Sequence, residues 1–178
     1  MIQFPEAFSP IELPKLEKLL SLLPKTMSYS VEVRHLDFFD KGKHEHALDV
    51  LLSSYGVERT IFDTRKLHST NSSIHSIVEA KRKKPKVPVR FVALTSRPMV
   101  RFVGVNDIFN NEAYLKEWAI VVADWINEGL HPYIFIHSPD SISQAKLATH
   151  FHNLLRELIE LPPLPEWPVN REAQLGLF

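Results

Sequence analysis

The chain has 178 residues, in which 21 Lys and Arg balance 21 Asp and Glu, and it contains no cysteine. This size suits one domain with a sizeable core, and the zero net charge supplies no overall field for nucleic acid or an anionic membrane. The lack of cysteine excludes disulfide scaffolds, thiolate metal sites and cysteine nucleophiles, and favours a cytoplasmic location.

Helical periodicity and short runs of β-branched and aromatic residues alternate along the chain. In chain order they predict a helix at 14–23, a strand at 29–35, a helix at 44–56, strands at 57–63 and 99–105, a helix at 113–129, a strand at 132–137 and a helix at 144–160. Such alternation predicts an α/β fold with a parallel sheet and outer helices. The most apolar helix is interrupted by Asp124, so we expect neither a membrane span nor a signal peptide.

Polar side chains recur at the C-terminal ends of the predicted strands. They are Glu32, Arg34 and His35 on the first strand, then Asp63, Arg101 and His137 on the three that follow. In parallel α/β architectures, and above all in (β/α)₈ barrels, side chains from these ends converge on the active site. The pattern therefore predicts a site. The alternative is a structural ion pair inside the sheet.

The residue types at these strand ends favour an anionic ligand. Guanidinium groups bind phosphate or carboxylate in a planar, bidentate way, so Arg34, His35 and Arg101 are the predicted substrate-binding residues. The predicted catalytic acids and bases are Glu32, Asp63 and His137. The same three side chains would also suit a divalent metal. We prefer the anion and expect no cofactor.

Two other patterns have simpler explanations. In HEH at 44–46, and again at His150 and His152, the histidines are two residues apart and point to different faces of a helix, so metal binding is not expected. The basic run AKRKKPK at 80–86 is typical of a solvated surface. The alternative is a contact with a phosphate backbone, although no aromatic residues are interleaved for base stacking.

The runs QFPEAFSP, YSVEVRHLDFF, IFDTR, VRFVG and IFIHSPD resemble the YecE-like family, number 72 of the domains of unknown function, over essentially the whole chain. The resemblance implies the C-terminal part of a TIM-type (β/α) barrel at residues 1–161. A complete barrel takes about 250 residues, so we expect an incomplete one. Its exposed edge strands favour self-association, with Val33, Ile61 and Phe135 as unpartnered interior residues.

Residues 162–178 are rich in proline and are predicted to form an extended tail. The tail ends in QLGLF, which resembles the peptide by which many bacterial repair and replication proteins dock on the DNA sliding clamp. The resemblance implies that the clamp is contacted by Gln174, Leu175, Leu177 and Phe178. The alternative is that this apolar end folds back on its own domain.

The sequence indicates the fold class better than a reaction, and the family it resembles is one of unknown activity. The preferred hypothesis is an enzyme, or an enzyme remnant, that binds a phosphate-bearing substrate or nucleic acid at the strand ends. One alternative is a non-catalytic module that docks on the sliding clamp. The other is a metabolic enzyme of sugar or carboxylate substrates.

Overall fold

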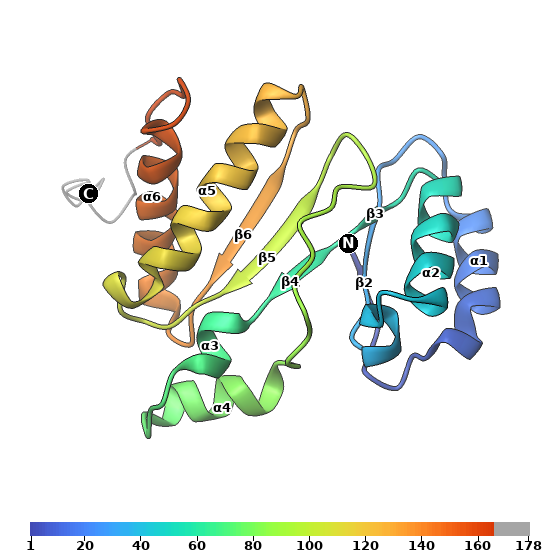
Figure 1. Cartoon of the computed structure of the whole chain (residues 1–178), viewed down its shortest axis with the longest axis horizontal. Coiled ribbons are helices and arrows are strands. Elements are labelled where there is room, and N and C mark those ends of the chain that lie inside the picture. The colour runs from blue at the N-terminus through green and yellow to red at the C-terminus, as the bar shows by residue number, and fades with distance from the viewer. Residues whose placement is uncertain (166–178) are drawn as a thin grey trace, which may run out of the picture.

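The structure, a computed structural model, describes residues 1–165, and Figure 1 shows strands and helices alternating along them. Over this range the strands are β1 (Ile2–Gln3), β2 (Ser30–Glu32), β3 (Glu58–Arg59), β4 (Ile61–Asp63), β5 (Met99–Val103) and β6 (Tyr133–His137). The α-helices are α1 (Leu13–Leu22), α2 (Lys43–Ser54), α3 (Arg65–Ser69), α4 (His75–Lys83), α5 (Glu112–Asn127) and α6 (Ser141–Arg156). Short 3₁₀ helices η1 (Pro10–Glu12), η2 (Leu36–Phe39) and η3 (Phe109–Asn111) precede α1, α2 and α5. Up to residue 165, no helix has the length and apolar character needed to cross a lipid bilayer.

The strands form two three-stranded sheets, β1–β2–β3 and β4–β5–β6, and every pairing is parallel. Only Thr60 separates β3 from β4, and its N–H donates to the carbonyl of Val31 at 2.8 Å. One continuous segment, 58–63, therefore joins the two sheets. Within residues 1–165 the strands do not close into a barrel, and β1 and β6 each pair with one neighbour.

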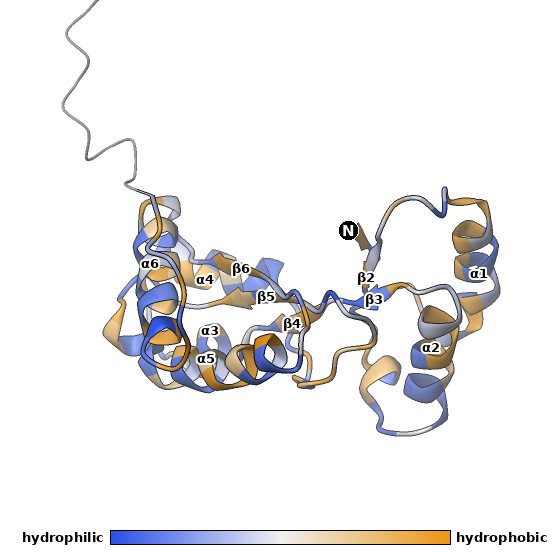
Figure 2. Cartoon of the chain, turned by 90° about the horizontal axis from the view of Figure 1, so that it is seen from above, coloured by the Kyte–Doolittle hydropathy of each residue, from blue (hydrophilic) through white to orange (hydrophobic). Residues whose placement is uncertain are grey.

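Each sheet buries the face that its helices cover. Leucines four residues apart on α1 and α2, such as Leu48 and Leu52, pack with Val31 and Val33 of the first sheet. On the second sheet, α5 and α6 form one core with alternate residues of β4 and β5, centred on Trp118. Figure 2 shows hydrophobic and hydrophilic residues interleaved along these helices, as amphipathic packing requires.

The predicted α/β class is confirmed, with four predicted helices and four predicted strand regions in their expected order. The prediction that Val33 and Ile61 face the interior of an incomplete barrel is wrong. Both side chains lie in the helix-facing cores and are 2% and 7% exposed. Phe135 lies on the opposite face of its strand and is 47% exposed. The tail residues Gln174, Leu175, Leu177 and Phe178 lie outside the described residues.

Candidate functional site

The face of the strands that points away from the helices, here called the inner face, carries most of the predicted site. On β6, Ile134 and Ile136 pack against the helix-facing core. Because side chains alternate along a strand, His137 lies on the inner face. The same alternation places Glu32 opposite the buried Val31 and places Arg101 between two core residues of β5.

Glu32 is fully buried and its carboxylate is shared by two arginines. Its Oε1 accepts hydrogen bonds from Arg34 Nε at 3.0 Å and Arg34 Nη2 at 2.9 Å. Its Oε2 accepts from Arg101 Nη1, which also donates to Gln3 Oε1 at 3.0 Å. Two guanidinium groups around one carboxylate leave a positive charge on the inner face.

The aromatic ring of Phe62 on β4 contacts both guanidinium groups. The Cζ atoms of Arg34 and Arg101 lie 5.5 and 5.2 Å from the centre of its ring, within the range of cation–π contacts. Phe62 is itself only 2% exposed, so the ring is a fixed platform. The two arginines are therefore held by a carboxylate on one side and by an aromatic ring on the other.

Two further basic groups face this cluster. Partial burial, and then the charges of Arg101 and Arg34, lower the pKa of Lys84, which directly follows α4, while Glu32 acts in the opposite direction. Partial burial, then Arg101 and Lys84, likewise lower the pKa of His137. Sequence reasoning missed Lys84, because only the fold brings the end of α4 to the strand ends. The group formed by Glu32, Arg34, Lys84, Arg101 and His137 is called the strand-end cluster below.

Asp63 does not join the strand-end cluster, so the predicted convergence is wrong for this residue. Its buried carboxylate accepts hydrogen bonds from Arg65 Nη2 and Trp118 Nε1, both at 2.8 Å, on the helix side of β4. Residues two apart on a strand share a face, and Ile61 is packed in the core under α5. On β4, the side chain that lies on the inner face is therefore that of Phe62.

His35 begins the 3₁₀ helix η2. Its Nδ1 accepts a hydrogen bond from the N–H of Asp37 at 3.2 Å, and its ring meets that of Phe38 edge-on with the centroids 6.3 Å apart. These contacts give it a capping role in the local structure. Its predicted part in substrate binding stays a prediction.

The structure offers little support for a metal centre. In residues 1–165 no three or more Asp, Glu or His side chains are grouped in a way that could hold a metal ion. The three ligands considered from the sequence are divided between two faces, because Asp63 points to the helices. His150 contacts Glu112, and His152 lies 2.8 Å from the carbonyl of Pro162, so each has a local partner.

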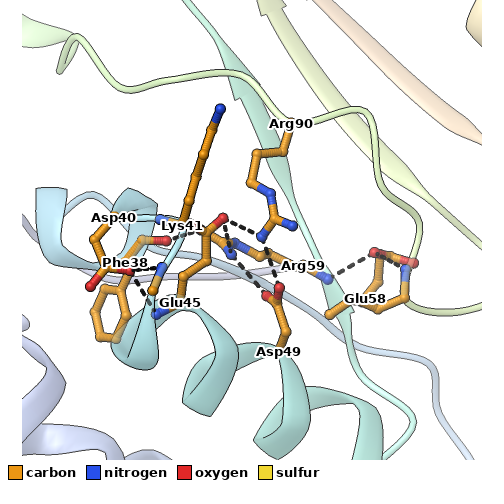
Figure 3. Close-up of polar contacts among 10 residues, drawn as sticks. Phe38, Asp40, Lys41, Glu45, Asp49, Glu58, Arg59 and Arg90 are labelled. Atoms are coloured by element: carbon orange, nitrogen blue, oxygen red, sulfur yellow. Dashed lines mark hydrogen bonds and ion pairs between the residues drawn. The ribbon is translucent and has the colours of Figure 1, made fainter.

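A second, partly buried ion cluster lies between α2 and the segment at 84–98, and its positive and negative charges are balanced (Figure 3). Arg59 Nη1 and Arg90 Nη1 lie 2.8 and 2.9 Å from the two carboxylate oxygens of Asp49, and Arg90 also pairs with Glu45. Two carboxylates thus neutralise two guanidinium groups. This cluster fastens the segment before β5 to α2 and leaves no excess charge for a ligand, unlike the strand-end cluster.

Comparisons with known proteins relate the chain to uncharacterised proteins. A family model described as "Protein of unknown function DUF72" matches residues 1–170. The chain is 39% and 38% identical to the UPF0759 proteins YecE of Escherichia coli K12 and O157:H7, over 94% of this chain and 61% of each relative. The crystal structure of a DUF72 family protein from Enterococcus faecalis V583 is similar at 13% identity with a TM-score of 0.62, over 90% of this chain and 60% of that one. The chain thus spans about three fifths of the length of these proteins.

Proposed function

The chain belongs to the DUF72 family of proteins of unknown function, and we propose that it binds a phosphate-bearing ligand at the strand-end cluster. The observation that carries this proposal is the excess of positive charge there. Within residues 1–165, Glu32 is the one carboxylate that pairs with Arg34 and Arg101, and its charge also acts on Lys84. A bound dianion would neutralise this excess.

Unused hydrogen-bond donors support the same ligand. A guanidinium group carries five N–H donors in a planar fork. Within the described residues, Arg34 uses Nε and Nη2 but not Nη1, and Arg101 uses Nη1 but neither Nε nor Nη2. Lys84 Nζ has no hydrogen-bond partner in the same part of the chain. Free, preorganised donors of this kind match the oxygens of a phosphate group.

The roles within the strand-end cluster follow from its contacts. Glu32 is fully buried and occupied by two guanidinium groups, so we assign it to positioning Arg34 and Arg101. His137 has a lowered pKa and is neutral at neutral pH, so it is the side chain best suited to exchange a proton with a bound ligand. Asp63, with its partners Arg65 and Trp118, is assigned to stability.

We also propose that the two sheets are the C-terminal part of a TIM-type barrel. The parallel strands, the helices on their outer side, and the single pairing of β1 with β2 and of β6 with β5 support this view. Such barrels place their active sites at the C-terminal strand ends, where the strand-end cluster lies. Docking on a sliding clamp through the QLGLF tail, and action on sugars or carboxylates, stay alternative predictions from the sequence.

The test is calorimetric titration of the whole chain with inorganic phosphate, together with thermal unfolding in the presence of phosphate. We expect saturable binding that raises the unfolding temperature. Lys84→Ala removes an unpaired charge and should weaken binding about tenfold, equivalent to about 1.4 kcal/mol. Arg34→Ala should do the same.

Lys146→Ala is the matched control, because Lys146 is an exposed lysine on α6 and does not belong to the strand-end cluster. It should bind phosphate like the parent chain. Absence of saturable binding to the parent would refute the proposed function, and so would equal binding by the Lys84→Ala chain.

A further inference from the structure

A surface of basic side chains extends outward from the strand-end cluster along α4. This basic tract is made of Arg34, Lys81, Arg82, Lys83, Lys84 and Lys86. It lines a cavity of about 400 Å³, together with Pro5, Glu6, His68 and Pro85. The sequence shows the run at 80–86 as an isolated basic stretch, whereas the fold places it against Arg34, 47 or more residues earlier in the chain.

The contacts of the basic tract leave much of its charge unneutralised. Arg82 and Lys83 share a single carboxylate, that of Glu79, at 3.1 and 3.3 Å. Lys81 donates to the carbonyl of Thr70, which carries no charge. Lys86 is exposed and, among residues 1–165, has no ion-pair partner.

Like charges that line one cavity repel one another. Within residues 1–165, Glu6 is the only acidic residue that lines the cavity. Within residues 1–165 the tract therefore has six cations against three carboxylates, those of Glu6, Glu32 and Glu79, and Glu32 is also shared with Arg101. Because the whole chain has zero net charge, this excess is a local property of one surface.

We infer that the basic tract binds the phosphodiester backbone of a nucleic acid and leads it to the strand-end cluster. This inference rests on the proposed function, since Arg34 and Lys84 belong to both the tract and the strand-end cluster. One phosphate group would occupy those two side chains. Among residues 1–165, Lys86 would then still have no ion-pair partner, and Lys83 would still share the single carboxylate of Glu79 with Arg82. A ligand with regularly repeated negative charges occupies all of them.

The lining of the cavity favours contacts to the backbone over contacts to the bases. In the part of the chain that the structure describes, no aromatic side chain other than His68 lines it, so stacking platforms of the kind found in single-strand binders are scarce there. Backbone contacts position a nucleic acid without selecting its sequence. We therefore expect weak, sequence-independent binding that depends steeply on salt.

An anionic membrane is a poorer match for the same charges. A helix that lies on a bilayer inserts a continuous apolar face into the lipid. On α4 the apolar Ile77 is 5% exposed because it belongs to a core with Phe62 and Leu67. The cations also line a concavity, which a flat bilayer would not enter and an extended chain would.

The experiment is fluorescence anisotropy of a labelled oligonucleotide, single-stranded and duplex, titrated with the whole chain at several salt concentrations. We expect a dissociation constant of roughly 10⁻⁴ to 10⁻⁶ M near physiological salt. The double variant Lys83→Gln/Lys86→Gln should bind about tenfold more weakly. The slope of its log affinity against log salt concentration should be smaller by about two, because about two phosphate contacts are lost. The matched control is Lys18→Gln/Lys25→Gln, which removes two exposed lysines in and after α1 and should behave like the parent chain.

Inorganic phosphate separates this inference from the proposed function. Lys83→Gln/Lys86→Gln should bind phosphate as the parent does, whereas Lys84→Ala should lose affinity for both ligands. Phosphate binding without oligonucleotide binding would overturn the inference and leave the proposed function standing. Equal losses in the tract and control variants would also overturn it, as would binding only to vesicles of anionic lipid.

Discussion

At the scale of single residues, we predict that the ligand binding proposed for the strand-end cluster is coupled to the protonation of His137. The pKa of His137 lies below its ordinary value of 6.5, because partial burial and the charges of Arg101 and Lys84 disfavour the imidazolium form, while Glu32 opposes them. As the pH falls below about 6.5, the unfolded chain gains a proton at this residue before the folded chain does. The free protein therefore loses stability in this range.

A bound dianion should reverse the electrostatic part of this shift. The pKa of His137 then rises on binding, the complex takes up a proton, and affinity increases as the pH falls. Sulfate is the suitable probe because, unlike phosphate, it does not titrate near neutrality. We expect calorimetry between about pH 5.5 and 7.5 to show tighter sulfate binding at the lower pH in the parent, and a flatter dependence in His137→Gln. The same pH dependence in both chains would contradict this role.

The sequence was sufficient to predict four members of the strand-end cluster and not the fifth. Glu32, Arg34, Arg101 and His137 stand out because charged and imidazole groups at strand ends are visible as a pattern. Lys84 was missed, because its neighbours in the fold are far away in the sequence. Asp63 was placed on the wrong face, since alternation in IFD leaves two choices and only the packing of Ile61 under α5 decides between them.

At the scale of elements, β5 and α5 are joined by a turn that requires glycine for reasons of space. The buried Asn111 accepts a hydrogen bond from the N–H of Val105 and donates to its carbonyl, both at 2.9 Å. A Cβ atom at Gly104 would lie 2.1 Å from Asn111 Oδ1 and 2.9 Å from Cε1 of Phe102. The side chain of Asn111 has no room to move without losing these bonds.

We therefore expect Gly104→Ala to lower the free energy of unfolding by about 1–3 kcal/mol. Urea denaturation followed by circular dichroism measures the change. In the double variant Gly104→Ala/Asn111→Ala the clash with Asn111 is absent and only the close contact with Phe102 remains. The double variant should therefore lose less stability than the sum of the losses in the two single variants. A change within about 0.5 kcal/mol for Gly104→Ala, or full additivity, would argue against a steric cause.

The elements missed by sequence reasoning are short or atypical. β1 has two residues, too few for a detectable alternation, and α3 has five. The basic residues of α4 obscure its helical periodicity in the sequence. Its buried apolar residue is Ile77. The four long helices were predicted because their leucines and aromatic residues recur on one face, and packing against the sheets then fixed their positions.

At the scale of the whole molecule, the two faces of the sheets are covered unequally. Helices bury the outer faces, whereas Tyr133 and Phe135 on the inner face of β6 remain 48% and 47% exposed. β6 is also an edge strand, paired only with β5 within residues 1–165. Apolar side chains beside an unpaired edge favour association with another chain. We therefore expect the predicted self-association to occur through the inner face of β6.

We expect light scattering coupled to size-exclusion chromatography to give a mass above the 20.5 kDa of one chain, rising with protein concentration. Phe135→Glu should restore the monomer and keep the fold, because the side chain is half exposed and points away from the core under α5 and α6. The matched control is Ile120→Glu, at an apolar side chain of α5 that is 54% exposed. If the inner face mediates association, this control keeps the parent mass. A parent chain of 20.5 kDa at every concentration, or equal dissociation by both substitutions, would show that the inner face of β6 does not bind a second copy.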